Sequence, residues 1–221
     1  MRDGACCCRY VTPTHYEADP HVVQALHTIL SSGKGVGAPA SSLQSVSDFG
    51  AGVGQYGKSL LALNPRHRYR GYDGAGNIEE YTDGFLKWFD LSRPLSMPRT
   101  DWVMTLEMGE HIPPEHEALV LRNLHAHNCK GLIVSWGQLG QPGHAHVNNH
   151  SPQYVVRQIE GLGYRVSDKL TSLMRDGRGP PPPRYMHPAY GVAQLKAVTV
   201  FERIKPLDDA ECARVPPDCR A

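Results

Sequence analysis

The sequence predicts an α/β protein with a doubly wound, mostly parallel, seven-stranded sheet. Three observations support this fold class. Short apolar segments alternate with amphipathic ones of helical spacing, a glycine-rich turn joins one such strand to a helix, and acidic residues end several strands. Alternation of strand and helix is typical of parallel βαβ units. The 221 residues fit one hydrophobic core of this kind.

One domain with two irregular ends accounts for the whole chain. Residues 1–14 look irregular, residues 15–206 carry the alternating pattern, and the aperiodic residues 207–221 predict a disordered tail. Asp19 is the expected N-cap of the first helix, with Pro20 at its first position. Expected helices are 20–30, 54–63, 114–127 and 152–162; expected strands are 45–49, 68–73, a short segment ending at residue 90, 101–106, 131–136, 164–166 and 195–204.

Charge and apolar content limit the partners. Lys and Arg number 23 against 22 Asp and Glu, a net charge of +1, which gives no broad electrostatic footprint for nucleic acid and favours a small-molecule acceptor. The sequence contains no apolar run of the roughly 20 residues that a bilayer span needs, and no signal-peptide pattern.

The six cysteines predict no disulfide framework. Cys6, Cys7 and Cys8 are consecutive, and the other three are scattered, so we expect reduced thiols and a cytoplasmic protein.

A glycine-rich turn is the first candidate ligand site. Gly50, Gly52 and Gly54 follow the apolar strand that contains Asp48 and precede an amphipathic helix from Gln55. Glycines at alternate positions allow positive φ and close approach of the backbone to a ligand. Asp48 is placed to accept a hydrogen bond from a ligand amine. Glycine in a tight strand-to-helix turn is also explained without any ligand.

The second element of this site is an acid at the end of the next strand. Asp73 comes 19 residues after Gly54, about where a doubly wound sheet places the carboxylate that holds ribose hydroxyls. The alternative is a turn residue before Gly74. Asp90 is a third acid, at a third candidate strand end.

Four segments together resemble the class I S-adenosylmethionine-dependent methyltransferase superfamily over residues 45–166: Asp48-Phe49-Gly50-Ala51-Gly52-Val53-Gly54, Asp73, Asp90-Leu91, and Leu106-Glu107-Met108-Gly109-Glu110-His111-Ile112. The resemblance implies the Rossmann-like methyltransferase fold with S-adenosyl-L-methionine as cofactor. By the same resemblance, Asp48 and the three glycines surround the methionine part, Asp73 binds ribose, Asp90 and Leu91 flank adenine, and Glu107 lies at the end of the fourth strand. The even spacing of the glycines departs from Gly-x-Gly-x-x-Gly and favours the sulfonium cofactor over NAD.

Methyl transfer to an oxygen or nitrogen of an unidentified acceptor is the predicted activity. Catalytic candidates lie where the fourth and fifth strands end: Glu107, His111, His144 and His146, with Glu110 and Trp136 nearby. Glu110 and His111 can instead cap a helix or face solvent. Two other functions fit the same fold: a noncatalytic cofactor-binding module, and a nucleotide-dependent oxidoreductase or sugar-nucleotide enzyme.

A divalent metal is a further prediction. Glu107, Glu110 and His111 form an E-x-x-E-H pattern, and His144-x-His146 follows the next strand, so two carboxylates and two imidazoles can converge on Mg²⁺ or Mn²⁺. The pattern is similar to the metal site of small-RNA 2′-O-methyltransferases, which implies Glu107, Glu110, His111 and either His144 or His146 as ligands. Solvated histidines in a glycine-rich loop are the alternative.

Overall fold

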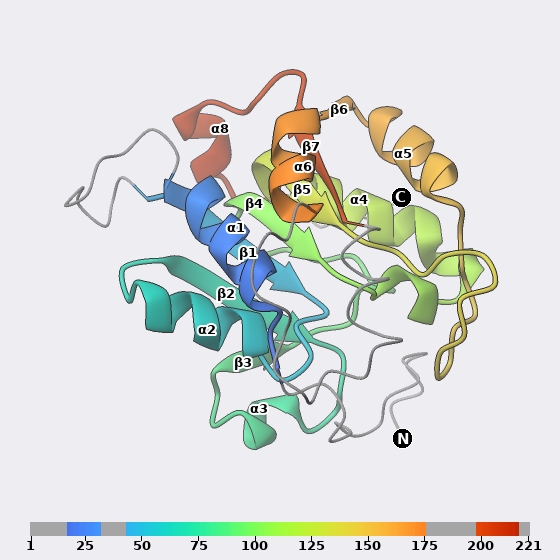
Figure 1. Cartoon of the computed structure of the whole chain (residues 1–221), viewed down its shortest axis with the longest axis horizontal. Coiled ribbons are helices and arrows are strands. Elements are labelled where there is room, and N and C mark those ends of the chain that lie inside the picture. Colours follow the sequence, from blue (N-terminus) through green and yellow to red (C-terminus); the bar gives the residue numbers. More distant parts are fainter. Residues whose placement is uncertain (1–16, 32–42, 176–197, 217–221) are drawn as a thin grey trace.

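A seven-stranded sheet with helices on both faces forms the centre of the protein (Figure 1). The computed structural model describes residues 17–31, 43–175 and 198–216. Its strands are β1 (Ser45–Phe49), β2 (Arg68–Asp73), β3 (Leu86–Trp88), β4 (Thr100–Thr105), β5 (Asn128–Val134), β6 (Tyr164–Val166) and β7 (Thr199–Arg203). Its helices are α1 (Pro20–Ser31), α2 (Gln55–Leu63), α3 (Ile78–Tyr81), α4 (Glu117–Ala126), α5 (Pro152–Glu160), α6 (Asp168–Arg175) and α8 (Asp209–Ala213), with 3₁₀ turns η2 (Gly109–His111) and η3 (Pro114–His116).

The strand order is β3-β2-β1-β4-β5-β7-β6. The first five of these strands run parallel, and β7 is antiparallel to both β5 and β6. The predicted doubly wound, mostly parallel sheet is therefore confirmed. The chain reverses its direction of winding between β1 and β4, and ligands of open α/β sheets bind in the crevice at the carboxyl ends of the strands there.

Alternating side chains along the strands contribute to two core clusters, one on each face of the sheet. Successive side chains of a strand point to opposite faces. On β4, Val103 therefore packs into one cluster with α4 and α5, whereas Trp102 and Met104 pack into another with α1, α2 and α6. On β5, Leu132 and Val134 join the first cluster and Ile133 joins the second. Both faces of the sheet are covered, which is typical of mostly parallel sheets.

Most predicted elements lie within a few residues of the observed ones. Asp19 caps α1 as expected, since its Oδ1 accepts hydrogen bonds from the backbone N–H groups of His21 and Val22 at 2.8 and 3.3 Å. Two short helices, α3 and α6, occur where no helix was predicted. Part of residues 195–204, like residues 1–14 and the cysteines at positions 6–8, lies outside the described residues.

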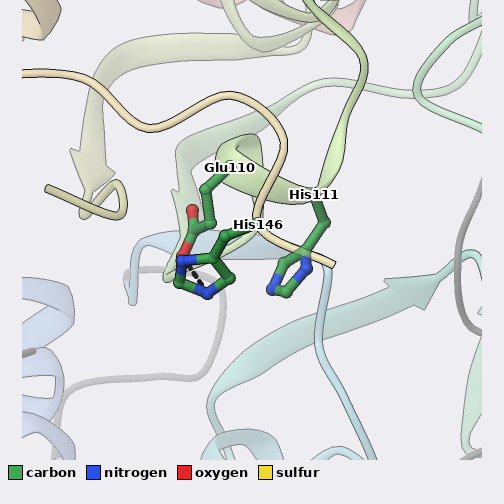
Figure 2. Close-up of side chains that lie close together, drawn as sticks. All are labelled: Glu110, His111 and His146. Carbon is green, nitrogen blue, oxygen red and sulfur yellow. Dashed lines mark ion pairs between the residues drawn. The ribbon is translucent and has the colours of Figure 1, made fainter. Parts of the chain in front are cut away.

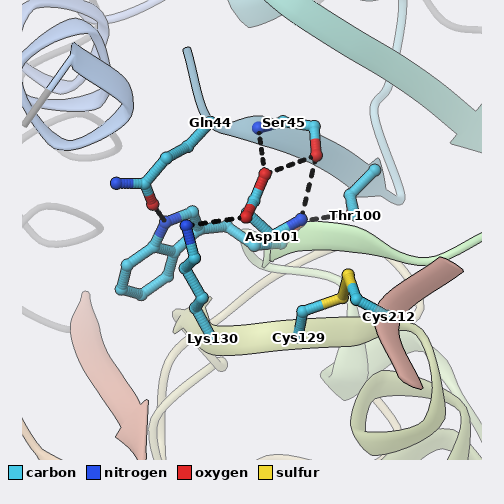
Figure 3. Close-up of polar contacts among 8 residues, drawn as sticks. Gln44, Ser45, Thr100, Asp101, Cys129, Lys130 and Cys212 are labelled. Atoms are coloured by element: carbon cyan, nitrogen blue, oxygen red, sulfur yellow. Dashed lines mark hydrogen bonds and ion pairs between the residues drawn. A yellow bond between two sulfur atoms is a disulfide. The ribbon is translucent and has the colours of Figure 1, made fainter. Parts of the chain in front are cut away.

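The C-terminal segment is more ordered than its sequence predicts. Residues 209–213 form α8, which begins with a capping box between Asp208 and Glu211. A disulfide joins Cys212 of this helix to Cys129 of β5, with a Cα–Cα distance of 5.6 Å (Figure 3). The expectation of reduced thiols was wrong for this pair. A sequence separation of 83 residues gives no local spacing to read, so only the tertiary structure reveals the pairing.

The amino ends of β1 and β4 are joined by a fully paired polar network (Figure 3). The two oxygens of the Asp101 carboxylate divide its partners: Oδ2 accepts from the N–H and hydroxyl groups of Ser45 at 2.7 and 2.8 Å, and Oδ1 lies 2.8 Å from Lys130 Nζ. These contacts hold the pKa of Asp101 below its usual range. This edge of the sheet has a structural role.

Candidate functional site

The glycine-rich turn lies at the carboxyl end of β1, next to the first residues beyond β4. Gly50, Gly52 and Gly54 have φ values of +81°, +60° and +78°, a left-handed conformation that side chains with a Cβ rarely adopt. Gly50 has a second reason to be glycine, because a Cβ there would lie 2.5 Å from Cγ of Met108. The predicted turn is therefore formed, and it is packed directly against the segment that follows β4.

Asp73, the last residue of β2, is tied to this turn. Its Oδ2 accepts a hydrogen bond from the N–H of Gly52 at 2.8 Å, and its Oδ1 accepts one from the N–H of Ala75 at 2.9 Å. Burial raises its pKa, and these N–H groups oppose the rise. The acid at the end of β2 and the glycine turn after β1 thus form one hydrogen-bonded unit.

Asp48 is a buried carboxyl inside the same corner. It is 2 % exposed, and its Oδ2 accepts a hydrogen bond from the Tyr69 hydroxyl at 2.9 Å. Burial raises its pKa to about 7; the Tyr69 hydrogen bond opposes this rise, and the charge of Asp73 adds to it. Around neutral pH this carboxyl is therefore poised between its two protonation states, and a cationic ligand beside it would favour the ionised one.

Asp90 and Leu91 follow β3 in a tight turn. The Asp90 carboxylate accepts hydrogen bonds from the N–H and hydroxyl of Ser92 at 2.9 and 2.6 Å, and it lies 3.1 Å from Nε of Arg93. Leu91 is buried in the same core cluster as Phe89. The Asp90 side chain therefore stabilises its own turn, whatever further contact it makes.

Tyr56, on the first turn of α2, connects this corner electrostatically to β4. Burial raises its pKa to about 12, and the negative charges of Asp19, Asp48 and Glu107 act in the same direction. The Tyr56 phenol thus interacts electrostatically with both Asp48 of β1 and Glu107, which follows β4. No sequence pattern marks Tyr56 or Tyr69 as site residues, because an aromatic residue near a glycine turn is often simply part of the core.

Two carboxyl groups lie side by side just after β4. Glu107 adopts a left-handed backbone conformation with φ of +51°, an unusual state for a residue with a side chain. Its Oε2 accepts a hydrogen bond from Gln141 Nε2 at 2.8 Å. Glu110, in η2, is 0 % exposed. Burial raises the pKa of Glu110 to about 8, and the neighbouring Glu107 carboxylate acts in the same direction.

Two histidines complete this cluster (Figure 2). The ligand atoms of Glu110, His111 and His146 all lie within 4.8 Å of one another. The rings of His111 and His146 meet edge to face with centroids 4.9 Å apart, and His146 Nε2 lies 4.0 Å from Glu110 Oε1. His144 is exposed and does not belong to this group. Of the four predicted metal ligands, the structure brings three together and leaves Glu107 beside them, bonded to Gln141.

The loop that carries His146 is held by its backbone. The carbonyl oxygen of Glu110 accepts hydrogen bonds from the N–H groups of Val147 and Asn148 at 2.8 and 3.0 Å. Trp136 Nε1 donates to the carbonyl of Asn148 at 2.7 Å. Because these bonds join the loop after β5 to the turn after β4, His146 is positioned beside Glu110 by the main chain rather than by its own side chain.

A buried acid of α4 anchors the far end of this loop. The Glu117 carboxylate accepts hydrogen bonds from Asn148 at 2.9 Å and from the Tyr154 hydroxyl at 2.6 Å, and it lies 2.6 Å from His150 Nε2. These partners hold the pKa of Glu117 below its usual range. His150 thus has a structural partner away from the cluster. The sequence signal for this anchor was only the density of polar residues after β5.

A hollow of about 410 Å³ lies between α5, α6 and β7. It contains none of the predicted site residues, and it adjoins Arg175 and Thr199, which flank the segment 176–197 that the structure does not describe. The predicted site residues lie instead mainly at the carboxyl edge of β1, β2 and β4. Among the described helices, none is both long and apolar enough to cross a membrane.

Comparison with known proteins bears on the fold alone. No family model and no curated protein matches the sequence. Three solved structures are similar. A 1,6-didemethyltoxoflavin-N1-methyltransferase of Burkholderia thailandensis, with bound 1,6-didemethyltoxoflavin and S-adenosylhomocysteine, has 17 % identity and a TM-score of 0.50, with 85 % of this chain and 79 % of that chain covered.

The second is an O-methyltransferase family protein of the same bacterium, with 12 % identity, a TM-score of 0.52, and 85 % of this chain and 57 % of that chain covered. The third is a putative methyltransferase in complex with the Trm112 methyltransferase activator of Haloferax volcanii, with 14 % identity, a TM-score of 0.50, and 83 % and 88 % covered. The strand order, the glycine turn after β1 and these likenesses agree: the chain has the fold of the class I S-adenosylmethionine-dependent methyltransferases.

Proposed function

We propose that this chain is an enzyme that transfers a methyl group from S-adenosyl-L-methionine to an oxygen or nitrogen of a small-molecule acceptor. One observation carries the proposal: the left-handed glycine turn is hydrogen-bonded to the acid of β2 and packs against the carboxylate-bearing segment after β4. A cofactor corner and candidate proton acceptors thus share one edge of the sheet, where open α/β sheets bind ligands.

The proposed cofactor-binding residues lie at the carboxyl ends of β1, β2 and β3, and each group would bind a different part of S-adenosylmethionine. Asp48 and the glycines Gly50, Gly52 and Gly54 would surround the methionine part, and a cationic amine beside Asp48 would favour the ionised form of its buried carboxyl. Asp73 would hold the ribose hydroxyls while keeping its bond to Gly52. Since the Asp90 carboxylate is engaged by Ser92 and Arg93, the adenine would be flanked by the turn backbone at Asp90 and Leu91.

The chemistry asks little of the protein beyond alignment and removal of a proton. S-adenosylmethionine supplies an electrophilic methyl carbon on its sulfonium. As the acceptor atom forms its bond to that carbon, the carbon–sulfur bond breaks, its electron pair stays on sulfur, and the acceptor proton leaves. Glu107, His111 and His146 are the groups we propose for holding the acceptor or taking that proton. His144, which is exposed, stays a weaker prediction.

The nature of the acceptor follows from charge and from the similar structures. A net charge of +1 gives no broad excess of positive charge of the kind that favours nucleic-acid binding. One similar structure has a small heterocycle bound, and another is described as an O-methyltransferase family protein. A small hydroxyl- or amine-bearing molecule is therefore the acceptor class we propose. The Mg²⁺ or Mn²⁺ ion and the cytoplasmic location stay predictions, and the Cys129–Cys212 disulfide is more typical of an oxidising compartment.

Calorimetric titration of the full chain tests the cofactor. We expect S-adenosylmethionine and S-adenosylhomocysteine each to bind with one molecule per chain, and NAD not to bind. Preference for NAD would contradict the proposal and favour an oxidoreductase on the same fold.

Formation of S-adenosylhomocysteine tests turnover. It should rise above background when S-adenosylmethionine is incubated with the chain and hydroxyl or amine acceptors from a broad panel. Cofactor binding with no turnover across that panel would favour the noncatalytic binding module.

A further inference from the structure

Glu110 is a deeply buried acid with few close polar contacts. Its side chain is 0 % exposed, and neither carboxyl oxygen makes a hydrogen bond of good geometry to the described residues, although the N–H groups of Glu110 and Gly137 and the Glu107 carboxyl group lie near it. Asp101, at the opposite edge of the same sheet, has partners for both oxygens (Figure 3). The ionised form of such a buried acid is costly, and a cation bound beside Glu110 would stabilise that form.

Ligands for such a species converge from two segments of the chain. Figure 2 shows Glu110 and His111 on the turn after β4 and His146 on the loop after β5. Their ligand atoms lie within 4.8 Å of one another. Two ligands with bonds of about 2.0–2.2 Å to one ion are at most about 4.4 Å apart, so small side-chain rotations would close the set.

The backbone around the cluster is arranged for His146. Gly143 leaves room for the imidazole, since a Cβ at that position would lie 2.0 Å from His146 Nε2. Gly137 likewise makes room for Glu110, whose Cγ would lie 2.9 Å from a Cβ at that position. The N–H groups after His146 donate to the carbonyl of Glu110, which joins the two halves of the cluster. Loops that are merely solvated do not require such close packing.

We propose that Glu110, His111 and His146 bind one divalent first-row transition-metal ion, such as Mn²⁺, Fe²⁺ or Zn²⁺. Two imidazoles with one carboxylate suit these ions, whereas Mg²⁺ prefers oxygen ligands and water. The set differs from the sequence prediction in omitting Glu107, which is not part of the group within 4.8 Å and whose Oε2 accepts a hydrogen bond from Gln141.

The ion would lie at the edge of the sheet that carries the cofactor corner, because Met108, between Glu107 and the ligands, contacts Gly50. Three protein ligands leave further positions on the ion for an acceptor oxygen, and metal binding makes a hydroxyl more acidic. This role rests on the proposed methyl transfer, whereas ion binding itself does not. With the ion bound, His111 and His146 would hold the acceptor through it, Glu107 would be the group that takes the proton, and a hydroxyl-bearing acceptor would be preferred over an amine.

Direct binding of Mn²⁺ tests the site. The full chain is freed of metal with a chelator, and loss of the paramagnetic resonance signal of free Mn²⁺ is followed as protein is added. We expect one ion per chain, displaced by Zn²⁺ and not by an equal concentration of Mg²⁺. His146→Ala and Glu110→Gln should each weaken binding by at least about tenfold.

His144→Ala is the matched control. It removes an imidazole from the same loop, two residues away and exposed, so Mn²⁺ binding should equal that of the parent chain. Circular dichroism and the unfolding midpoint of each variant establish that it is folded. Absence of stoichiometric binding, or equal losses in His144→Ala and His146→Ala, would overturn the proposal.

A titration with S-adenosylmethionine in chelator separates the two proposals. Cofactor binding without Mn²⁺ binding would remove the ion and leave methyl transfer in place. Mn²⁺ binding without cofactor binding would keep the metal site and remove the proposed function.

Discussion

Replacing Asp48 by asparagine should make the protein more stable at alkaline pH. The Asp48 carboxyl is buried at the carboxyl end of β1, where burial raises its pKa from 3.8 to about 7. Asparagine has nearly the same shape, its oxygen can keep the hydrogen bond from Tyr69, and it carries no charge at any pH. The variant therefore removes one thing only, the ionisation of a buried acid.

The sign and size follow from proton linkage. A raised pKa means that the folded state holds this proton more tightly than the unfolded state, so stability falls as pH rises from 3.8 to about 7. One unit of pKa shift corresponds to about 1.4 kcal/mol, so the complete loss is about 4 kcal/mol. Between pH 4.5 and pH 8.5, the free energy of unfolding of Asp48→Asn minus that of the parent should rise by about 3 kcal/mol.

Urea unfolding at a series of pH values measures this difference. Only the change with pH matters, since asparagine shifts stability by a constant amount for other reasons. The control is Asp101→Asn, at the opposite edge of the sheet. The pKa of Asp101 is lowered, so its stabilisation is present above the ordinary pKa of an aspartate and is lost as pH falls. A difference for Asp48→Asn that stays flat, or that falls with rising pH, would refute the reasoning.

Three further changes test the site and the disulfide. Asp73→Asn should weaken S-adenosylmethionine binding by about 1.5 to 3 kcal/mol, the range for a hydrogen bond to a charged group, as measured by calorimetry; a loss below about twofold would make Asp73 only a turn residue. Gly50→Ala should lower the unfolding free energy by about 1 to 3 kcal/mol, because φ is +81° and the new Cβ would meet Met108; an unchanged urea midpoint would contradict this. Cys212→Ser opens a link across 83 residues and should cost about 4 kcal/mol in non-reducing buffer and nothing in dithiothreitol; equal midpoints in both buffers would show that Cys129 and Cys212 are not joined.

Local patterns in the sequence determined the architecture and the corner formed by the glycine turn and Asp73. Apolar segments of period two and helical spacing located the strands and the longer helices, because the side-chain directions of each element are fixed by its own backbone. The glycine turn and the acid 19 residues later were likewise predicted, since a left-handed turn and a strand-end carboxylate are local requirements. The short helices α3 and α6 were missed because four and eight residues carry little periodic signal.

Only the tertiary structure decided which distant side chains meet. The E-x-x-E-H pattern and the two loop histidines left four candidate metal ligands in addition to His144, and the sequence has no means of choosing among them. Hydrogen bonds from the loop backbone to the Glu110 carbonyl place His146 in the cluster. Gln141 donates a hydrogen bond to Glu107, which lies beside the cluster, and His144 is exposed to solvent. The Cys129–Cys212 bond is likewise a contact between distant residues that only the tertiary structure reveals. Contacts between residues far apart along the chain depend on how the loops fold back, and that geometry is set by the packed sheet rather than by any local spacing.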